Sequence, residues 1–291
     1  MTHKAGFVNI IGSPNVGKST LMNQLMGEKL SIVTSKAQTT RHRILGIFNT
    51  EESQIVFSDT PGVIKSSYKL HENMMKYVNT SIKDADIILL ITDIKENEIN
   101  HKQTLDRIKS CNVPVICLIN KIDLSNQDIV SERLKYWQNR LPKATIIPIS
   151  ALHKFNLDRV WDEIISHTPE NPPYFDKNSI TNRPMRFFIS EMIREKIFLH
   201  CKKEIPYATQ VEIEEYKEED KIVNIRAVII VERNSQKGII IGKGGEMLKR
   251  IGRESRIDMQ KFIHKKVFLE TFVKVDKNWR ESDYKLKKYG Y

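Results

Sequence analysis

The sequence predicts an α/β domain with a mostly parallel sheet and helices on both faces, followed by a smaller α+β domain. Three observations support this fold class. Over the first ~165 residues, short apolar runs alternate with longer amphipathic stretches, which is typical of a parallel sheet covered by helices. A proline-rich segment then interrupts this alternation, and a different order of elements follows it. Finally, 291 residues are too many for one ordinary core and enough for two.

The strands expected in the first domain are apolar runs of four to six residues, rich in Ile and Val and bounded by polar residues or glycine. This length and composition distinguish them from buried helices. The expected strands cover residues 7–11, 54–58, 87–92, 115–119 and 146–149. An edge strand is expected over residues 43–49, and a helix over residues 20–26.

The boundary between the domains is predicted at residues 168–183, a linker that begins with Thr-Pro-Glu-Asn-Pro-Pro-Tyr. The first domain then covers residues 1–167 and the second covers residues 184–291. The second domain should contain a helix, an antiparallel hairpin around an acidic turn, a pair of helices separated by a glycine turn, and a last strand. These elements are expected over residues 185–202, 210–216 and 223–232, from the glycine cluster at 242–245 to about residue 263, and over 266–275.

Basic side chains are concentrated late in the chain. The net charge of +11 divides into +3 for residues 1–179 and +8 for residues 180–291. Residues 180–232 carry 9 basic and 10 acidic side chains, so the whole excess of the second part lies beyond Glu232. A local basic field of this kind indicates a polyanionic partner, although a solvated lysine-rich face would give the same charge.

Composition and cysteine content indicate a cytoplasmic protein. Hydrophobic residues make up 40% and charged residues 29%, a balance typical of globular rather than disordered or membrane proteins. No apolar run approaches the roughly 20 residues of a membrane helix, and the first residues lack the features of a signal peptide. The three cysteines are widely separated and match no metal-ligand spacing, so we expect them to be reduced.

A phosphate-binding loop is expected after the first strand. The pattern GxxxxGKS is matched by Gly12, Ser13, Pro14, Asn15, Val16, Gly17, Lys18 and Ser19, and Thr20 continues into a helix. Glycines allow backbone N–H groups to surround a phosphate, and the helix N-terminus adds its positive dipole. Lys18 would contact the β- and γ-phosphates of a nucleotide, and the hydroxyl of Ser19 would coordinate Mg²⁺.

A second metal anchor is expected directly after the strand over residues 54–58. The run Asp59, Thr60, Pro61 and Gly62 fits the pattern DxxG. This motif is weak alone and gains weight from its position at the end of a strand beside the phosphate loop. Asp59 would hold Mg²⁺ through a water molecule, and the N–H of Gly62 would sense the γ-phosphate.

Two switch loops are expected around these motifs. Residues 36–42 would form the first, in which Thr40, in preference to Thr39, would complete the Mg²⁺ shell when GTP is bound. Residues 59–77 would form the second. Both loops would be ordered by the γ-phosphate and would relax after hydrolysis.

The expected catalytic residues are Lys18, Thr40 and Gly62. The glutamine that accompanies such residues in many GTPases is missing. Many GTPases place a glutamine after the glycine of DxxG to orient the attacking water, and this chain has Val63 there. We therefore expect slow intrinsic hydrolysis of GTP to GDP. We also consider the hypothesis that Asn15 helps to hold K⁺. The ion would then perform part of the role of an arginine finger, which stabilises charge in the transition state.

The base specificity is expected to come from the pattern NKxD. A carboxylate can accept hydrogen bonds from both N1–H and the exocyclic amine of guanine, whereas adenine offers neither donor in that arrangement. ATP would leave this carboxylate unpaired, at a cost on the order of several kcal/mol. The expected base contacts are Asn120, Lys121 and Asp123, together with Ser150, Ala151 and Leu152, which supply a backbone N–H for the guanine oxygen.

An RNA-binding turn is expected inside the basic part of the chain. A GxxG turn with a lysine inside it follows an apolar run and precedes an amphipathic helix, and in KH domains such a turn clamps about four nucleotides. A plain turn between helices and a solvated basic face are the alternatives. The expected RNA contacts are Ile241, Gly242, Lys243, Gly244, Gly245, Lys249, Arg250 and Arg253. The terminal segment made of Trp279-Arg280 and residues 284–291 mixes aromatic and basic side chains, which fits either an RNA-contacting tail or a docked helix.

Taken together, these motifs resemble the Era family of bacterial GTPases over almost the whole chain. The resemblance rests on the phosphate loop, Gln38-Thr39-Thr40-Arg41, Asp59-Thr60-Pro61-Gly62, Asn120-Lys121-Ile122-Asp123, Ser150-Ala151-Leu152 and Gly242-Lys243-Gly244-Gly245. It implies a P-loop GTPase domain followed by a type II KH domain with a basic C-terminal tail. Val63 agrees with the family, which also lacks the glutamine.

The resemblance also implies partners that the residues alone do not identify. It implies a monomer that binds the 3′ region of 16S ribosomal RNA, assists maturation of the small ribosomal subunit and does not bind DNA. It further implies a cytoplasmic location with peripheral association at the inner face of the cell membrane. Two other functions stay open, a membrane-surface GTPase whose basic domain binds anionic lipid and a GTP-dependent RNA-modifying factor.

Overall fold

The computed structural model describes residues 2–96 and 102–291, which form two compact units. The first unit comprises the residues up to Ser67 together with His71–Asn182, and the second comprises Tyr68–Leu70 and Arg183–Tyr291. Within the described residues, no helix is both long and apolar enough to span a membrane.

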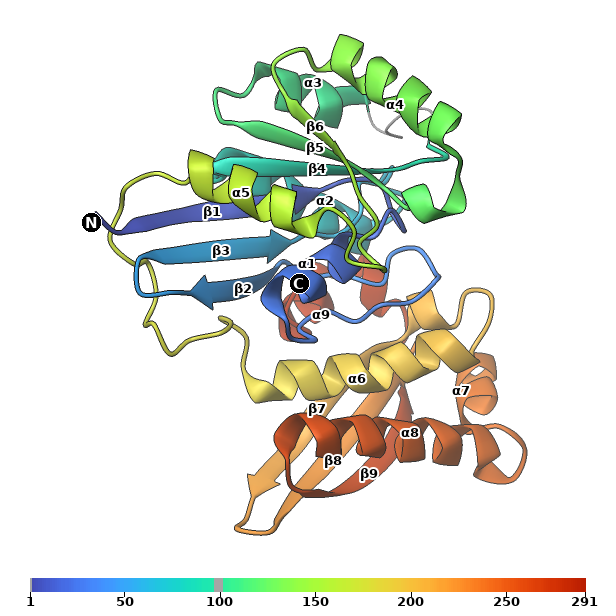
Figure 1. Ribbon diagram of the computed structural model, residues 1–291. Helices are drawn as coiled ribbons and strands as arrows, with labels where there is room; N and C mark the ends of the chain where they lie inside the picture. Colours follow the sequence, from blue (N-terminus) through green and yellow to red (C-terminus); the bar gives the residue numbers. More distant parts are fainter. Residues whose placement is uncertain (1, 97–101) are drawn as a thin grey trace. The chain divides into compact units, whose positions relative to one another are not determined.

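The first unit is built on a sheet whose strand order, among the described residues, is β2-β3-β1-β4-β5-β6 (Figure 1). The strands are β1 (Lys4–Ile11), β2 (Ile44–Asn49), β3 (Ser53–Asp59), β4 (Ile87–Asp93), β5 (Val115–Asn120) and β6 (Thr145–Pro148). Only the pairing of β2 with β3 is antiparallel in this described sheet. The predicted parallel sheet and its edge strand are therefore confirmed. β1 begins earlier than predicted because Lys4 already pairs with Ser53.

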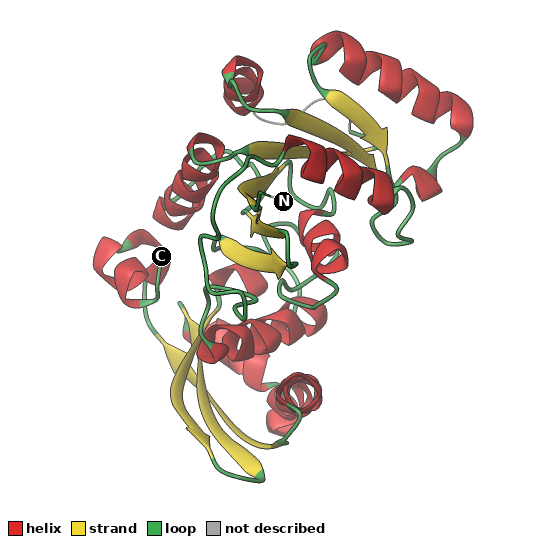
Figure 2. Cartoon of the chain, turned by 60° about the vertical axis from the view of Figure 1, so that its left-hand side comes forward, coloured by secondary structure: helices red, strands yellow, loops and turns green. Residues whose placement is uncertain are grey.

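Helices cover both faces of this sheet (Figure 2). They are α1 (Lys18–Met26), α2 (Lys69–Lys83), α3 (Lys102–Ser110), α4 (Gln127–Arg140) and α5 (Leu157–His167). Val78 of α2, Ile108 of α3 and Trp137 of α4 belong to one buried cluster with the strands. α1 and α5 lie on the opposite face, where Met22 of α1 lies beside Gly46 and Trp161 of α5 contacts Phe57, the cross-strand partner of Gly46. A predicted α/β fold with helices on two sides is thus confirmed.

The segment expected to link the domains, residues 168–183, belongs to the first unit up to Asn182, and residues 168–182 lie along the sheet of that unit. The N–H of Ile47 in β2 donates to the carbonyl of Ile180 at 2.9 Å. The side chain of Gln54 in β3 is fully buried, accepts hydrogen bonds from the N–H groups of Tyr174 and Phe175, and donates to the Phe175 carbonyl at 2.8 Å. These bonds satisfy the backbone of a proline-rich segment that has no regular structure of its own.

The second unit follows the predicted helix and strand order. Its elements are α6 (Met185–His200), β7 (Gln210–Glu218), β8 (Ile222–Val231), α7 (Asn234–Ile241), α8 (Glu246–Ile263), β9 (Lys266–Val275) and α9 (Asp283–Lys288). β7 and β8 form the predicted antiparallel hairpin, and β9 runs parallel to β8 (Figure 1). One face of this sheet packs against α6 and α8 through buried residues that include Ile193, Ile225 and Met259.

The C-terminal residues dock onto the second unit. The side chain of Trp279 is fully buried, and its Nε1–H donates to the carbonyl of Ala208 at 3.0 Å. The hydroxyl of Tyr291 donates to Oε1 of Gln210 at 2.7 Å. Of the two interpretations of residues 279–291, the structure therefore favours docking for these aromatic side chains.

Candidate functional site

The phosphate loop connects β1 to α1 at the carboxyl edge of the sheet. Gly17 has φ 106°, in the left-handed region that favours glycine, and a Cβ atom there would lie 2.2 Å from Nδ2 of Asn120. A Cβ atom on Gly12 would lie 2.2 Å from the carbonyl oxygen of Ile91. The loop can therefore approach its neighbours this closely only with glycine at both positions.

Lys18 is held inside the loop. Its Nζ donates to the carbonyls of Gly12 at 3.2 Å and Ser13 at 2.7 Å. Burial lowers the pKa of Lys18 to about 8, although the charges of Asp59 and Glu96 act in the opposite direction. The amine thus occupies a fixed position where it can contact a bound phosphate.

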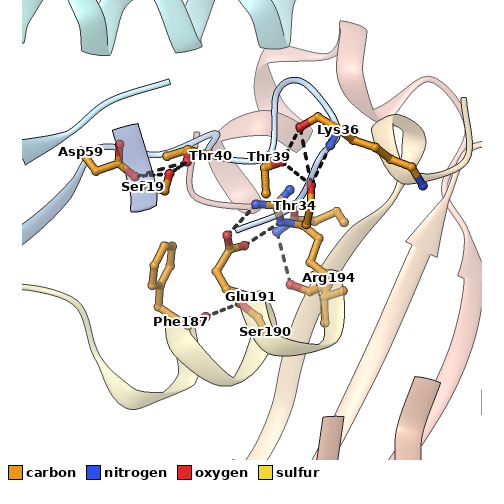
Figure 3. Close-up of polar contacts among 12 residues, drawn as sticks. Ser19, Thr34, Lys36, Thr39, Thr40, Asp59, Phe187, Ser190, Glu191 and Arg194 are labelled. Carbon is orange, nitrogen blue, oxygen red and sulfur yellow. Dashed lines mark hydrogen bonds and ion pairs between the residues drawn. The ribbon is translucent and has the colours of Figure 1, made fainter. Parts of the chain in front are cut away.

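The three residues predicted to hold Mg²⁺ lie together (Figure 3). The Ser19 hydroxyl donates to Oδ2 of Asp59 at 2.7 Å and lies 2.9 Å from Oγ1 of Thr40, which is 3.3 Å from the same carboxylate oxygen. Burial raises the pKa of Asp59, and the hydrogen bond from Ser19 and the charge of Lys18 oppose this rise. Oδ1 of Asp59 is buried without a hydrogen-bond partner among the described residues.

This donor set suits Mg²⁺. Magnesium prefers oxygen ligands, and a buried carboxylate oxygen without a partner costs free energy unless a cation or a water bound to a cation approaches it. The described residues contain no group of three or more His, Cys, Asp or Glu side chains that could hold a metal ion. Thr39 is turned away from Asp59 and donates to the carbonyl of Lys36 at 2.8 Å (Figure 3), which supports the choice of Thr40.

The residues after Asp59 pack closely against the phosphate loop. A Cβ atom on Gly62 would lie 2.8 Å from Cα of Pro14, and the N–H of Val63 donates to the carbonyl of Gly12 at 3.1 Å. Thr60 donates from its hydroxyl to the carbonyl of Ile10 at 2.8 Å. The Val63 side chain is fully buried in the apolar core and cannot orient a water molecule.

Asn120 joins the phosphate loop to the segment that follows β6. Its Nδ2 donates to the carbonyl of Val16 at 2.7 Å, and its Oδ1 accepts from the N–H of Ala151 at 2.9 Å. Both ends of one buried amide are therefore used to align two other motifs. The N–H of Ala151, one of those expected to face the guanine oxygen, is occupied by Asn120 in this structure.

Lys121 and Asp123 complete the guanine end of the site. Nζ of Lys121 donates to the carbonyl of Asn15 at 2.6 Å and lies 2.7 Å from Oδ2 of Asp93. The Ser150 hydroxyl donates to Oδ1 of Asp123 at 2.6 Å. This bond fixes the orientation of the Asp123 carboxylate, which can still accept further hydrogen bonds because each oxygen has two lone pairs. Leu152 follows with its side chain 68% exposed.

A pocket of about 360 Å³ follows the phosphate loop and is lined by Gly17, Lys18, Ser19, Thr40, Gly62 and Lys121, whereas Asn120, Asp123 and Ser150 do not line it. Residues 32–35 also line it, and sequence reasoning missed them because they belong to no recognisable motif. It also missed Glu96, which accepts a hydrogen bond from the Ser13 hydroxyl. The available signal for Glu96 was its position after β4, at the same edge of the sheet as the phosphate loop.

The glycine turn of the second unit connects α7 to α8. Gly242, Gly244 and Gly245 have φ values of 74°, 60° and 80°, so each adopts a conformation that glycine favours. Ile241 ends α7, and the side chain of Lys243 between the glycines is exposed. A turn of this shape leaves the backbone accessible to a phosphate.

Basic residues of α8 extend from this turn. Lys249 and Arg253 are exposed and four residues apart, so they share one side of the helix. Arg250 is also exposed, but its Nε donates to Oε1 of Glu254 at 3.1 Å. Lys249 and Arg253 are therefore better placed than Arg250 to contact a polyanion.

Comparisons with known proteins agree with both sites. Residues 7–121 match a family model described as 50S ribosome-binding GTPase, and residues 204–280 match one described as KH domain. GTPase Era of Geotalea uraniireducens is 44% identical over 290 residues, which cover 99% of this chain and 98% of the relative. GTPase Era of Clostridium kluyveri is 45% identical over 290 residues, with 99% of each chain covered.

Two similar solved structures contain ligands. One is a crystal structure of Era in complex with MgGDPNP and nucleotides 1506–1542 of 16S ribosomal RNA. The other is a variant of Aquifex aeolicus Era bound to GDP and AlF₄⁻. Each has a TM-score of 0.94 and 38% sequence identity to this chain, with 99% of both chains covered.

Proposed function

Because the chain belongs to the Era family of GTPases, we propose that it is a GTP-driven switch that binds the 3′ region of 16S ribosomal RNA and assists assembly of the small ribosomal subunit. The observation that carries the proposal is the meeting of Ser19, Thr40 and Asp59. Thr40 belongs to the expected first switch loop and Asp59 begins the second. A group bound between them can therefore order both loops at once.

The first unit would bind the phosphates of the nucleotide. Lys18 would exchange its hydrogen bonds to loop carbonyls for bonds to the β- and γ-phosphates, and its position inside the loop limits the reorganisation needed. The N–H of Gly62 would sense the γ-phosphate because this residue lies against Pro14 of the loop. The remaining expected loop contacts are Gly12, Ser13, Asn15, Val16, Gly17 and Thr20, with Thr60 and Pro61 after Asp59.

Ser19, Thr40 and Asp59 would hold Mg²⁺, with Asp59 acting through a water molecule. The ion would neutralise charge on the phosphate oxygens during hydrolysis. With Val63 buried, no side chain at that position orients the attacking water, and slow intrinsic hydrolysis follows.

We propose that K⁺ contributes at Asn15. This residue has φ 64°, and its Nδ2 donates to the carbonyl of Ser35 at 3.0 Å, so its side chain joins the phosphate loop to the residue that precedes the first switch loop. Hydrolysis should be several-fold faster in potassium than in sodium buffer at equal ionic strength, and Asn15→Ala should remove the difference. Equal rates in the two buffers for the wild-type chain would refute this part of the proposal.

Guanine selection would depend on Asp123, held by Ser150, with Lys121 over the base and Asn120 between the two loops.

RNA would bind the second unit at the glycine turn, with Lys243, Lys249 and Arg253 contacting phosphates. We further propose a cytoplasmic monomer with peripheral association at the membrane. GTP would favour the RNA-binding state by binding that state more tightly than the other one. A ligand shifts a conformational equilibrium only through such a difference in affinity.

The test is RNA affinity in three nucleotide states. The full chain is titrated with a labelled RNA from the 3′ end of 16S ribosomal RNA in the presence of a non-hydrolysable GTP analogue, GDP or no nucleotide. We expect tighter binding with the analogue and weaker binding of a shuffled RNA. Equal affinity in all three states would exclude the switch.

Two further arms test the alternatives. Preference for anionic lipid vesicles over the ribosomal RNA in competition would favour a membrane-surface GTPase. Depletion of the protein in cells should cause precursors of the small subunit to accumulate in sedimentation profiles. Normal subunit profiles after depletion would contradict the role in assembly.

A further inference from the structure

A second pocket of the first unit lies at the edge of the sheet opposite to the nucleotide site. It has a volume of about 540 Å³ and forms between the α3–β5 loop and the α4–β6 loop. Both loops enter the sheet at the amino ends of their strands, whereas Asn120 and Ser150 follow the carboxyl ends of β5 and β6 (Figure 1). The proposed GTP site lies at the carboxyl edge, where ligands of parallel α/β sheets usually bind. This pocket lies at the opposite edge and is therefore separate from that site.

The charged residues that line this pocket are all basic. They are Lys109 at the end of α3, Arg140 at the end of α4, and Lys143 in the α4–β6 loop. No Asp or Glu is among the described residues that line it. Lys109 and Lys143 are exposed, and Nη1 of Arg140 is oriented by a hydrogen bond of 2.9 Å to the hydroxyl of Tyr136.

The inner wall of the pocket is apolar. Ile108, Leu141 and Ala144 line it and are all buried, and Val113 and Val115 add partly buried aliphatic surface. Cations are favoured near helix C-termini, which explains the presence of Lys109 and Arg140. It explains neither Lys143, which lies outside both helices, nor an open cavity above an apolar wall.

We propose that this pocket binds a small organic anion with an apolar body, such as a carboxylate, sulfonate or phosphate ester. The apolar body would lie on Leu141 and Ala144, and the anionic group would be neutralised by Lys109 and Lys143. Small-molecule sites combine an apolar wall with a few polar groups in this way. The site and its ligand are independent of the proposed GTP and RNA functions.

Cys111 makes the proposal testable in the full chain. It lines the pocket and is partly exposed, whereas Cys117 and Cys201 are buried. Three disulfide reagents of different charge can be compared at this thiol, namely anionic 5,5′-dithiobis(2-nitrobenzoate), neutral 4,4′-dithiodipyridine and cationic cystamine. Excess GDP keeps the reagents out of the nucleotide site.

Reagent preference reports the charge of the pocket. Relative to a neutral free thiol, Cys111 should favour the anionic reagent over the cationic one by roughly tenfold. Lys109→Glu with Lys143→Glu should abolish this preference, while the control pair Lys83→Glu with Lys135→Glu, at exposed lysines outside the pocket, should retain it. The ratio of rates cancels any change in the reactivity of the thiol itself, and Cys111→Ser should remove the reaction.

Protection reports reversible binding. Decanoate should slow the reaction of Cys111 with the neutral reagent in the wild-type chain and in the control pair, but not in the Lys109→Glu, Lys143→Glu chain. Guanine nucleotide binding by each variant confirms that it is folded. A preference no larger than that of the free thiol, or equal protection by decanoate and decanol, would overturn the proposal.

Discussion

The nucleotide site of the first unit and the glycine turn of the second unit depend on their surroundings to different degrees. A Cβ atom on Gly12, Gly17 or Gly62 would lie within 3 Å of atoms from other segments. A Cβ atom on Gly244 or Gly245 would meet nothing within 4 Å, and the close approach in this turn is at Gly242, where a Cβ atom would lie 2.7 Å from Cβ of Met247 in the following helix. The first motif is therefore part of the packing of its own unit, whereas the second is displayed on a fold that other residues build. Changes in the first should damage both binding and folding, whereas changes at the exposed side chain within the second, Lys243, should damage binding alone.

The largest effect should come from Gly17→Ala. The new Cβ atom would overlap the Asn120 amide, which cannot move without losing its bonds to Val16 and Ala151. Strain at φ 106° adds to this overlap, and the free energy of unfolding should fall by about 2–5 kcal/mol, with loss of GTP binding.

Gly27→Ala is the matched control for this substitution. Gly27 also has a positive φ, 71°, but a Cβ atom there would meet nothing within 4 Å. It should lose only about 1–2 kcal/mol and keep nucleotide affinity. Urea unfolding and nucleotide titration measure both quantities. If Gly17→Ala and Gly27→Ala behaved alike, the tight packing of the loop would not matter.

The same contrast explains what could be predicted from the sequence. Lys18, Ser19, Asp59 and Asn120 could be predicted because their chemistry requires these residue types at fixed spacing after strands. Glu96 could not, since a position after β4 is a weak signal for one carboxylate and its bond to Ser13 depends on tertiary structure.

Segments held by tertiary contacts were equally hard to predict. Residues 168–182 have the composition of a linker, and their hydrogen bonds to Gln54 and Ile47 come from residues more than a hundred positions away. The sequence could not predict whether Trp279 docks on the domain, because its hydrogen-bond partner is the carbonyl of Ala208, which is distant in the sequence. Local periodicity predicted the strands and helices, whereas contacts distant in sequence left no local signal.

A second large effect should follow Asp123→Asn. The amide would replace one acceptor with a donor facing the guanine amine, so GTP affinity should fall by about 100-fold or more. Xanthosine triphosphate has a carbonyl in place of that amine, and its affinity should rise. Stability should change little because the amide has nearly the same shape and keeps an oxygen that can accept the hydrogen bond from the Ser150 hydroxyl. Competition binding measures the exchange, and Asp128→Asn on α4 serves as the control. Unchanged preference for GTP would remove Asp123 from the base site.

A smaller effect is expected at the open turn. Replacing Lys243 and Lys249 with Glu should weaken RNA binding by roughly tenfold or more and reduce its salt dependence, because two phosphate contacts are lost. Thermal stability and GTP affinity should stay close to wild type, since both side chains are exposed. The control is Lys221→Glu in the β7–β8 turn of the same unit. Equal losses in the control would mean that general charge, rather than the turn, binds the RNA.

The smallest effect concerns the residues that build the second unit around its turn. Burial raises the pKa of Asp276, but hydrogen bonds from Lys285 and Tyr289 outweigh burial, so the folded pKa lies below the ordinary 3.8. The carboxylate therefore stabilises the fold fully above pH 3.8, and this contribution is lost as the pH falls further through the folded pKa.

Asp276→Asn should accordingly cost no more than about 1 kcal/mol of unfolding free energy at pH 6, because the pair is partly exposed to solvent. The difference from wild type should shrink as the pH falls below 3.8, as measured by urea unfolding across this range. Glu281→Gln, which removes the same charge from an exposed position nearby, should show no such convergence. A difference that stays constant with pH would mean that Asp276 acts through its shape rather than its charge, and the docking of α9 would then depend on the apolar packing of Leu286 and Trp279 alone.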